Sequence, residues 1–199
     1  MRLVIGLGNP GKKYEHTRHN MGFDVLDAFC DIAQVDVDKD LFKGLIGRGR
    51  IFDEDTMFLK PQTFMNLSGD SVVQVVNYFK IEIEDIIVIY DDMALEPGVV
   101  RLRANGTSGG HKGMQDIINK LHTSEIKRIR VGIGEPKFDV VDYVLGKPHD
   151  EEKEAIDKAI EIARDALKEA LKSNFNKAMS LYNGKALKHS NETIWETKN

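Results

Sequence analysis

An uninterrupted apolar run, IIVIY at residues 86–90, constrains the fold of this chain more than any other segment. Successive side chains of a strand point to opposite faces of its sheet, so a run without polar positions is apolar on both faces. This pattern is typical of a strand covered by helices on both sides, as in the parallel sheets of α/β proteins. The run ends directly at two carboxylates, Asp91 and Asp92.

The segments around this run alternate between strand and helix patterns. We expect further strands over residues 3–7, 44–52, 56–59, 99–103 and 126–133, with a turn at residues 53–55. We expect helices over residues 22–33, 68–79, 114–121, 151–172 and 175–182. The prediction is one α/β domain over residues 1–184, with a mixed, mostly parallel, twisted sheet sandwiched between helices. Residues 185–199, which include the only tryptophan, Trp195, are expected to form a polar, flexible tail.

The segment GLGNPG, residues 6–11, has the glycine spacing of a dinucleotide-binding turn but not its context. In such a turn the helix begins inside the glycine motif, so that its N-terminal amides bind the pyrophosphate. Here a charged segment, KKYEHTRHN, follows and delays the predicted helix until about Asn20. The acidic residue expected at the end of a second strand is also missing. We therefore expect these glycines to let the backbone turn at the edge of the sheet, and we expect no nucleotide cofactor.

A second segment, GTSGG at residues 106–110, has the spelling of the nucleophile elbow of serine esterases around Ser108. An elbow follows a buried apolar strand, whereas the preceding RLRAN is polar and alternating. The other members of a triad would come from Asp139 or Asp142 and from His149, and no further pattern supports them. The sequence therefore disfavours a serine nucleophile.

Composition and charge narrow the class of protein. With 41% hydrophobic and 30% charged residues, no stretch of bilayer-spanning length and no secretory signal, we expect a cytoplasmic protein without a membrane segment. The net charge is −4, but residues 99–137 carry eight lysines and arginines against three acidic residues. Such a block suits a nucleic-acid partner, because phosphate binding needs clustered cations, and it equally suits a solvated face.

Polar side chains of catalytic type gather after the predicted strands, where open α/β sheets form their sites. They are Asn9, His16, His19, Asn66, Asp91, Asp92, His111 and Lys112. Singly, each also fits a turn, a helix cap or a structural hydrogen bond. Together they suit water attack on an ester, because a histidine oriented by a carboxylate accepts a proton and amides stabilise an oxyanion. No second pair with ligand spacing accompanies His16 and His19, so we expect no metal site.

Six segments, in order along the chain, resemble the bacterial peptidyl-tRNA hydrolase family. They are GLGNPGKKYEHTRHNMGF, KPQTFMNLSG, IIVIYDDMALEPGVVRLR, GTSGGHKGMQDII, IKRIRVGIG and YVLGKP. The resemblance implies a cofactor-free, monomeric hydrolase that needs no protein partner and cleaves the ester between peptide and tRNA in peptidyl-tRNA. Such an enzyme recycles tRNA that is released prematurely from the ribosome.

The resemblance also implies roles for single residues. His19 corresponds to the base that activates water, and Asp91 to the acid that partners it. The substrate-binding residues correspond to Asn9, Tyr14, Phe64, Met65, Asn66 and Lys112. Arg103 and Arg130, both in the basic block, correspond to groups that bind the 5′-phosphate of the tRNA. The chain reads GGHKG where the family usually reads GGHNG, so Lys112 replaces an asparagine, and we expect altered substrate affinity.

Two other classes of protein stay open. An RNA-binding protein on the same scaffold would grip RNA without hydrolysing it, but it would be free to lose His19 or Asp91, and both are present. A small-molecule esterase would not need Arg103 and Arg130 near its cleft. Its rate would also be independent of the salt concentration, whereas a tRNA substrate binds more weakly as the salt concentration rises.

Overall fold

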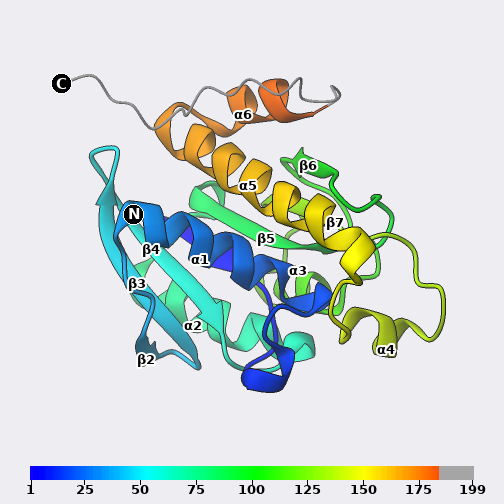
Figure 1. Cartoon of the computed structure of the whole chain (residues 1–199). Coiled ribbons are helices and arrows are strands. Elements are labelled where there is room, and N and C mark those ends of the chain that lie inside the picture. The colour runs from blue at the N-terminus through cyan, green and yellow to red at the C-terminus, as the bar shows by residue number, and fades with distance from the viewer. Residues whose placement is uncertain (184–199) are drawn as a thin grey trace.

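A seven-stranded sheet forms the centre of the computed structural model, which describes residues 1–183 (Figure 1). The strand order is β2-β3-β4-β1-β5-β7-β6. The strands are β1 (Arg2–Gly6), β2 (Lys39–Leu41), β3 (Gly44–Ile51), β4 (Glu54–Pro61), β5 (Ile86–Asp92), β6 (Val100–Arg103) and β7 (Lys127–Gly132). The predicted polar tail, residues 185–199 with Trp195, lies outside the described residues.

The four central strands, β4, β1, β5 and β7, run parallel to one another. Antiparallel pairing extends the sheet on both sides, through the β2-β3-β4 meander on one side and through β6 beside β7 on the other. The predicted mixed, mostly parallel sheet is therefore confirmed. The apolar run 86–90 occupies β5, and every residue of it is buried, as expected for a strand covered on both faces.

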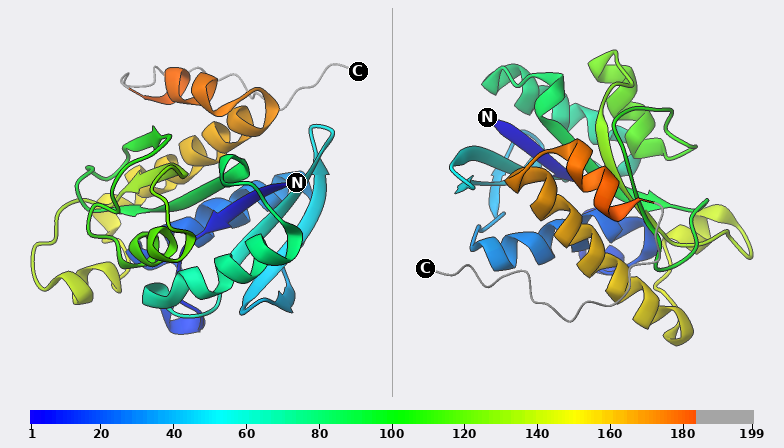
Figure 2. Two further views of the ribbon diagram at one scale, coloured as in Figure 1. Left: turned by 180° about the vertical axis from the view of Figure 1, so that it is seen from behind. Right: turned by 90° about the horizontal axis from the view of Figure 1, so that it is seen from above.

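Helices cover both faces of the sheet (Figures 1 and 2). On one face lie α1 (Met21–Ala33) and α5 (Asp150–Lys172), with α6 (Phe175–Tyr182) beside α5. On the other lie α2 (Ser68–Phe79) and α3 (Lys112–Leu121). In β5, Ile87 and Ile89 join the core under α1 and α5, whereas Ile86, Val88 and Tyr90 join the core under α2 and α3. None of the helices in residues 1–183 is both long and apolar enough to cross a membrane.

Two glycines let α1 lie directly on the strands. A Cβ on Gly6, the last residue of β1, would come 2.3 Å from the backbone oxygen of Gly22, and one on Gly22 would come 2.3 Å from the backbone oxygen of Ile89. Gly11 has a φ of 104°, which favours glycine. The helix begins only at Met21, as the charged segment predicted, so the GLGNPG glycines serve close packing and a turn.

The structure differs from the sequence-based prediction in short elements. The sequence predicted neither β2 nor α4 (Val140–Val144). The hairpin between β3 and β4 turns at Phe52 and Asp53 rather than at residues 53–55, with φ values of 48° and 65°. Positive φ at both central residues is the requirement of a type I′ two-residue hairpin turn, so β4 begins at Glu54, two residues earlier than predicted.

Candidate active site

The carboxyl ends of the central strands and the loops that follow them surround a cavity of about 470 Å³. Because β1 and β5 are parallel neighbours, the loop after β1 and the end of β5 meet at the same edge of the sheet. The cavity is lined on its polar side by Asn9, His19, Asn66, Asp91, Asp92, Ser108, His111 and Lys112. Its apolar lining includes Phe64, Met65, Met93, Val140, Val141, Val144 and Leu145.

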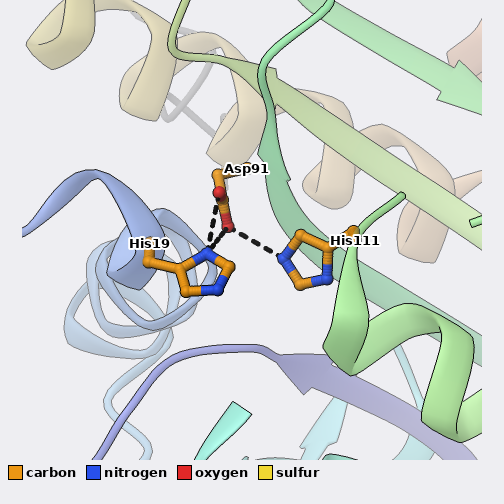
Figure 3. Close-up of side chains that lie close together, drawn as sticks. All are labelled: His19, Asp91 and His111. Atoms are coloured by element: carbon orange, nitrogen blue, oxygen red, sulfur yellow. Dashed lines mark hydrogen bonds and ion pairs between the residues drawn. The ribbon is translucent and has the colours of Figure 1, made fainter. Parts of the chain in front are cut away.

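The centre of the cavity wall is a carboxylate held between two imidazoles (Figure 3). His19 Nδ1 lies 2.9 Å and 3.0 Å from the two carboxylate oxygens of Asp91, and His111 Nε2 lies 3.0 Å from Asp91 Oδ1. The side chain of Asp91 is 2% exposed and that of His19 is 14% exposed. A carboxylate accepts from both rings, so neutral His19 carries its proton on Nδ1 and leaves Nε2 as a free base.

Three different elements position these side chains. Asp91 is near the end of β5, and His19 lies in a 3-10 turn, Arg18–Asn20, immediately before α1. His111 is the N-cap of α3, where its Nδ1 accepts a hydrogen bond from the backbone N–H of Met114 at 3.1 Å. Neutral His111 therefore carries its proton on Nε2 and donates it to Asp91.

These contacts shift the pKa values of the group. Burial alone raises the pKa of the Asp91 carboxyl, but the charges and hydrogen bonds of His19 and His111 outweigh it, so the pKa lies well below its usual range. Burial lowers the pKa of His19, and the charge and hydrogen bond of Asp91 together outweigh this effect. The pKa of His19 is therefore raised above the ordinary 6.5, while the ammonium group of Lys112 acts to lower it.

Asn9 is held in place by backbone and side-chain hydrogen bonds. Its Oδ1 accepts from the N–H of Met65 at 2.7 Å, and the side chain of Asn20 bonds both the backbone N–H and the carbonyl of Asn9, at 2.8 Å and 3.0 Å. Within residues 1–183 the Asn9 Nδ2 group has no acceptor, so its hydrogens are available to a molecule in the cavity. Asn66 is exposed and lines the same cavity.

The structure brings together most of the residues that the sequence predicted for substrate binding. Asn9, Phe64, Met65, Asn66 and Lys112 line the cavity with His19 and Asp91. Tyr14 does not line it, but its ring packs edge-on against Phe64, with the ring centres 6.4 Å apart. Tyr14 thus contacts the cavity wall rather than the cavity itself.

Arg103 and Arg130 lie together in a second cavity of about 230 Å³. This cavity shares Tyr90, Ser108 and Gly109 with the first, so the two are adjacent. Arg103 is exposed, whereas Arg130 donates from Nη1 to Asp92 at 2.7 Å. The buried Nε of Arg130 has no hydrogen-bond partner in the part of the chain that the structure describes.

Sequence reasoning did not assign a role to His111 or to the apolar wall formed by α4. His111 is one of the polar residues that follow the predicted strands, and its imidazole beside Lys112 is the sequence feature that points to the site. Its contact with Asp91 depends on tertiary structure, because the two residues are 20 positions apart. The α4 residues Val140, Val141 and Val144 carry no chemical signal at all and enter the site only through the fold.

His19, Asp91 and His111 bring ligand-type atoms within 4.8 Å of one another, a grouping that raises the question of a metal ion. A metal would need His111 Nε2 without its proton, which would move the proton to Nδ1. The N–H of Met114 already points at Nδ1, so in that tautomer the Nδ1–H and the Met114 N–H would be two donors facing each other. The residues therefore suit a hydrogen-bonded chain better than a metal centre.

The residues of the alternative serine triad serve separate elements. Ser108 Oγ lies 2.7 Å from Gln115 Oε1 and donates to it. Asp139 Oδ1 accepts from the backbone N–H groups at the start of α4, and His149 forms a capping box with Glu152 at the start of α5. These bonds argue against a Ser–His–Asp arrangement.

Comparisons with known proteins identify the family of this chain. The family model described as peptidyl-tRNA hydrolase matches residues 3–191. The peptidyl-tRNA hydrolase of Clostridium botulinum strain Eklund 17B is 48% identical over 92% of this chain and 96% of its own length. That of Clostridium perfringens strain 13 is 45% identical over 92% and 98%. The crystal structure of peptidyl-tRNA hydrolase from Acinetobacter baumannii superposes with a TM-score of 0.87 at 37% identity, covering 92% of this chain and 94% of that one. The chain therefore belongs to the peptidyl-tRNA hydrolase family.

Proposed function

We propose that this chain hydrolyses the ester that joins a peptide to the 3′ end of tRNA, with His19 as the base. His19 Nε2 takes a proton from a water molecule, and the water oxygen forms a bond to the acyl carbon. The Asp91 carboxylate holds Nδ1–H and stabilises the imidazolium that results. When the bond from the acyl carbon to the 3′ oxygen breaks, His19 returns its proton to that oxygen.

The amide groups around the cavity bind the reacting carbonyl in this proposal. The Asn9 Nδ2 group points no hydrogen at a protein acceptor within residues 1–183, and its Oδ1 is already fixed by Met65. An amide held in this way stabilises a developing oxyanion without ionising. Asn66 and Lys112 line the same cavity and supply further donors. Phe64 and Met65 supply apolar contacts to the peptide end, and Tyr14 supports Phe64.

The adjacent basic cavity binds a phosphate of the tRNA in this proposal. Guanidinium groups suit a terminal phosphate, because they offer paired N–H donors in a fixed plane. Arg103 is exposed, and Arg130 lines the same cavity beside it. The shared wall at Tyr90, Ser108 and Gly109 keeps the phosphate site next to the reacting ester.

The single observation that carries this proposal is the hydrogen bond between His19 Nδ1 and Asp91 in the wall of an open cavity. A protein that only binds RNA does not need that pair, and a small-molecule esterase does not need the basic cavity beside it. We further propose that the chain acts as a monomer, without a metal, an organic cofactor or a protein partner.

A hydrolysis assay tests class, substrate and cofactor together. It compares peptidyl-tRNA, aminoacyl-tRNA and a small ester, each with and without a chelator. We expect selective cleavage of peptidyl-tRNA that the chelator leaves unchanged. Loss of activity with the chelator would contradict the metal-free mechanism, and preference for the small ester would favour the esterase.

The variant His19→Ala tests the base. Its activity on peptidyl-tRNA is expected to fall by a factor of about a hundred or more, while tRNA binding persists. His16→Ala is the matched control, because His16 lies in the same loop, bonds Asp24 and does not line the cavity. Turnover like that of the wild type in His19→Ala would refute the assignment.

A further inference from the structure

Arg18, the residue before His19, is among the most deeply buried charged side chains in the described chain. Its side chain is 1% exposed, and its contacts all lead to one segment of the chain. Nη1 donates to the backbone oxygen of Tyr143 at 3.1 Å, and Nη2 donates to Glu152 Oε2 at 2.8 Å. The guanidinium carbon lies 4.1 Å from the centre of the Tyr143 ring.

These contacts tie the turn that carries His19 to both α4 and α5. Tyr143 is in the last turn of α4, and Glu152 is in the first turn of α5. The backbone N–H of Arg18 also donates to the oxygen of Gly146, in the link between the two helices, at 2.9 Å. One residue therefore bonds α4, the link and α5 at once.

The helix α4 depends on such external contacts for its position. It has only five residues, and a helix this short has little stability of its own. Its outer residues Val140 and Val141 are about half exposed, and Tyr143 is its most deeply buried residue. The Tyr143 backbone oxygen, in the last turn, accepts from Arg18 Nη1 as well as from the N–H of Gly146, and a cation there favours the negative end of the helix dipole.

We propose that Arg18 is a positioning residue that fixes the α4 wall of the active cavity relative to His19. Val140, Val141 and Val144 of α4 line the cavity from one side, and His19 lines it from another. Arg18 shares the 3-10 turn of His19 and bonds the last turn of α4. It therefore sets the distance between His19 and the α4 residues that line the cavity. This inference rests on the proposed function, because it assigns the wall to the binding of peptidyl-tRNA.

The proposal separates two effects on the reaction. The His19 ring is bonded by Asp91, which Arg18 does not contact, so the base itself is unchanged when Arg18 is replaced. The α4 wall loses its side-chain bonds to Arg18 and keeps the Tyr143 hydroxyl bond to the backbone oxygen of Ile133, so it is held less firmly and substrate binding weakens. The loss therefore appears mainly in KM, and the dependence of kcat/KM on pH keeps its position.

The test uses Arg18→Met, Arg18→Lys and Glu152→Gln in the full chain, with peptidyl-tRNA as substrate. We expect Arg18→Met to lower kcat/KM on the order of tenfold to a hundredfold, mainly through KM, because small displacements in a binding site have effects of this size. Arg18→Lys keeps the charge toward Glu152 but cannot also reach Tyr143 with a planar fork, so its KM is intermediate. Glu152→Gln keeps an acceptor for Nη2 but loses the charge that holds the guanidinium, so we expect a measurable rise in KM that is smaller than in either Arg18 variant. The pH at which kcat/KM rises is expected to match the wild type in all three.

Arg2→Met is the matched control for the loss of a well-bonded arginine. Arg2 donates to Thr56 Oγ1 and to the backbone oxygens of Leu171 and Ile51, and it does not line the active cavity. We expect this variant to have a lower Tm with a normal KM. Normal KM in the Arg18 variants, with only a lower Tm, would show a structural role and overturn the proposal. A fall in kcat alone, or a shifted pH profile, would place the effect on His19 and overturn it as well.

Two further readouts keep the result unambiguous. If Arg18→Met and Arg18→Lys do not fold, the KM of Glu152→Gln decides, because that variant retains the buried arginine and a neutral partner for it. A wild-type KM there would overturn the proposal. Failure of the wild-type chain to cleave peptidyl-tRNA, or full activity in His19→Ala, would contradict the proposed function, whereas normal KM in the Arg18 variants of an active enzyme contradicts only this inference.

Discussion

At the scale of single residues, Asp91 works because a carboxylate has two acceptor oxygens and no donor. It accepts from His19 Nδ1 and from His111 Nε2, and so it fixes the tautomers of both rings. An asparagine at this position would offer one oxygen and one NH₂ group, so one ring would face a donor. The chemistry proposed for His19 therefore depends on the ionised form of Asp91, which the lowered pKa of that carboxyl preserves.

Asp91→Asn is expected to shift the pH dependence of kcat/KM toward lower pH. The neutral form of His19 is the active base, so kcat/KM rises with pH through the pKa of His19. The charge of Asp91 holds this pKa above 6.5, and burial alone lowers it. Removing the charge lets the pKa fall, while the maximum rate drops by a factor of about a hundred or more because the ring loses its orientation. A pH–rate profile that moves to higher pH in this variant would contradict the assignment.

Lys112→Asn is expected to shift the same profile in the opposite direction. The ammonium group of Lys112 lowers the pKa of His19, so its removal raises that pKa and moves the rise in kcat/KM to higher pH. Lys120→Asn is the control, because Lys120 is in the same helix but bonds Asp70 and Asp116 outside the cavity. Measurement of kcat/KM against pH for the two variants decides. If the pH profile of Lys112→Asn equals that of Lys120→Asn, Lys112 does not act on the pKa of His19.

At the scale of elements, the position of α1 links core packing to the site. The helix starts at Met21, two residues after His19, and at Gly22 its backbone lies against β5 and the residue that follows β1. β5 ends in the two carboxylates of the site, Asp91 and Asp92. The contact between α1 and β5 therefore helps to set the distance between His19 and Asp91.

Gly22→Ala is expected to destabilise the protein and to reduce kcat together. The new Cβ would lie 2.3 Å from the backbone oxygen of Ile89 and 2.4 Å from the backbone nitrogen of Leu7, so the helix must move away from the strands. Overpacking of this kind costs about 1–3 kcal/mol of the free energy of unfolding. Helix propensity alone would instead favour alanine by about 1 kcal/mol. Urea unfolding distinguishes the two, and a stabilised variant would contradict the close contact.

Elements with strong local patterns could be predicted from the sequence, and those without such patterns could not. The run 86–90 and the long helical pattern 151–172 correspond to β5 and α5, with ends within one or two residues. β2 is three exposed residues without an apolar face, and α4 is a single turn of VVDYV, in which β-branched residues do not favour a helix. The sequence placed His19 and Asp91 after two separate predicted strands, 3–7 and 86–90, and the structure pairs these strands side by side. The contact of His111 with Asp91 and the burial of Arg18 against α4 arise only from tertiary packing.

In the whole molecule, many of the cations in the basic block, residues 99–137, are bonded within the protein and are not free to bind RNA. Arg128 bonds three backbone oxygens, Lys120 bonds two carboxylates and Lys127 bonds the oxygen of Glu84. Arg130 donates a hydrogen bond to Asp92. Four cations of this block line the two cavities: Arg103, Arg128, Arg130 and Lys112. Of these, Arg128 is buried and already bonded to backbone oxygens. The proposed interaction with tRNA therefore depends on few groups, placed next to the reacting ester, rather than on an extended basic face.

The salt dependence of KM measures how many such groups engage phosphate. Each phosphate that the protein neutralises releases condensed counterions, so KM for peptidyl-tRNA is expected to rise as salt rises. Arg103→Met should raise KM at low salt and reduce the slope of log KM against log salt by about one. Arg50→Met is the control: Arg50 is an exposed arginine on β3, near the turn into β4 and outside both cavities. Its loss removes the same charge from the molecule and is expected to leave the slope unchanged. Equal changes in both variants would show that only the net charge of the molecule matters, and a slope near zero in the wild type would mean that no phosphate is bound in the basic cavity.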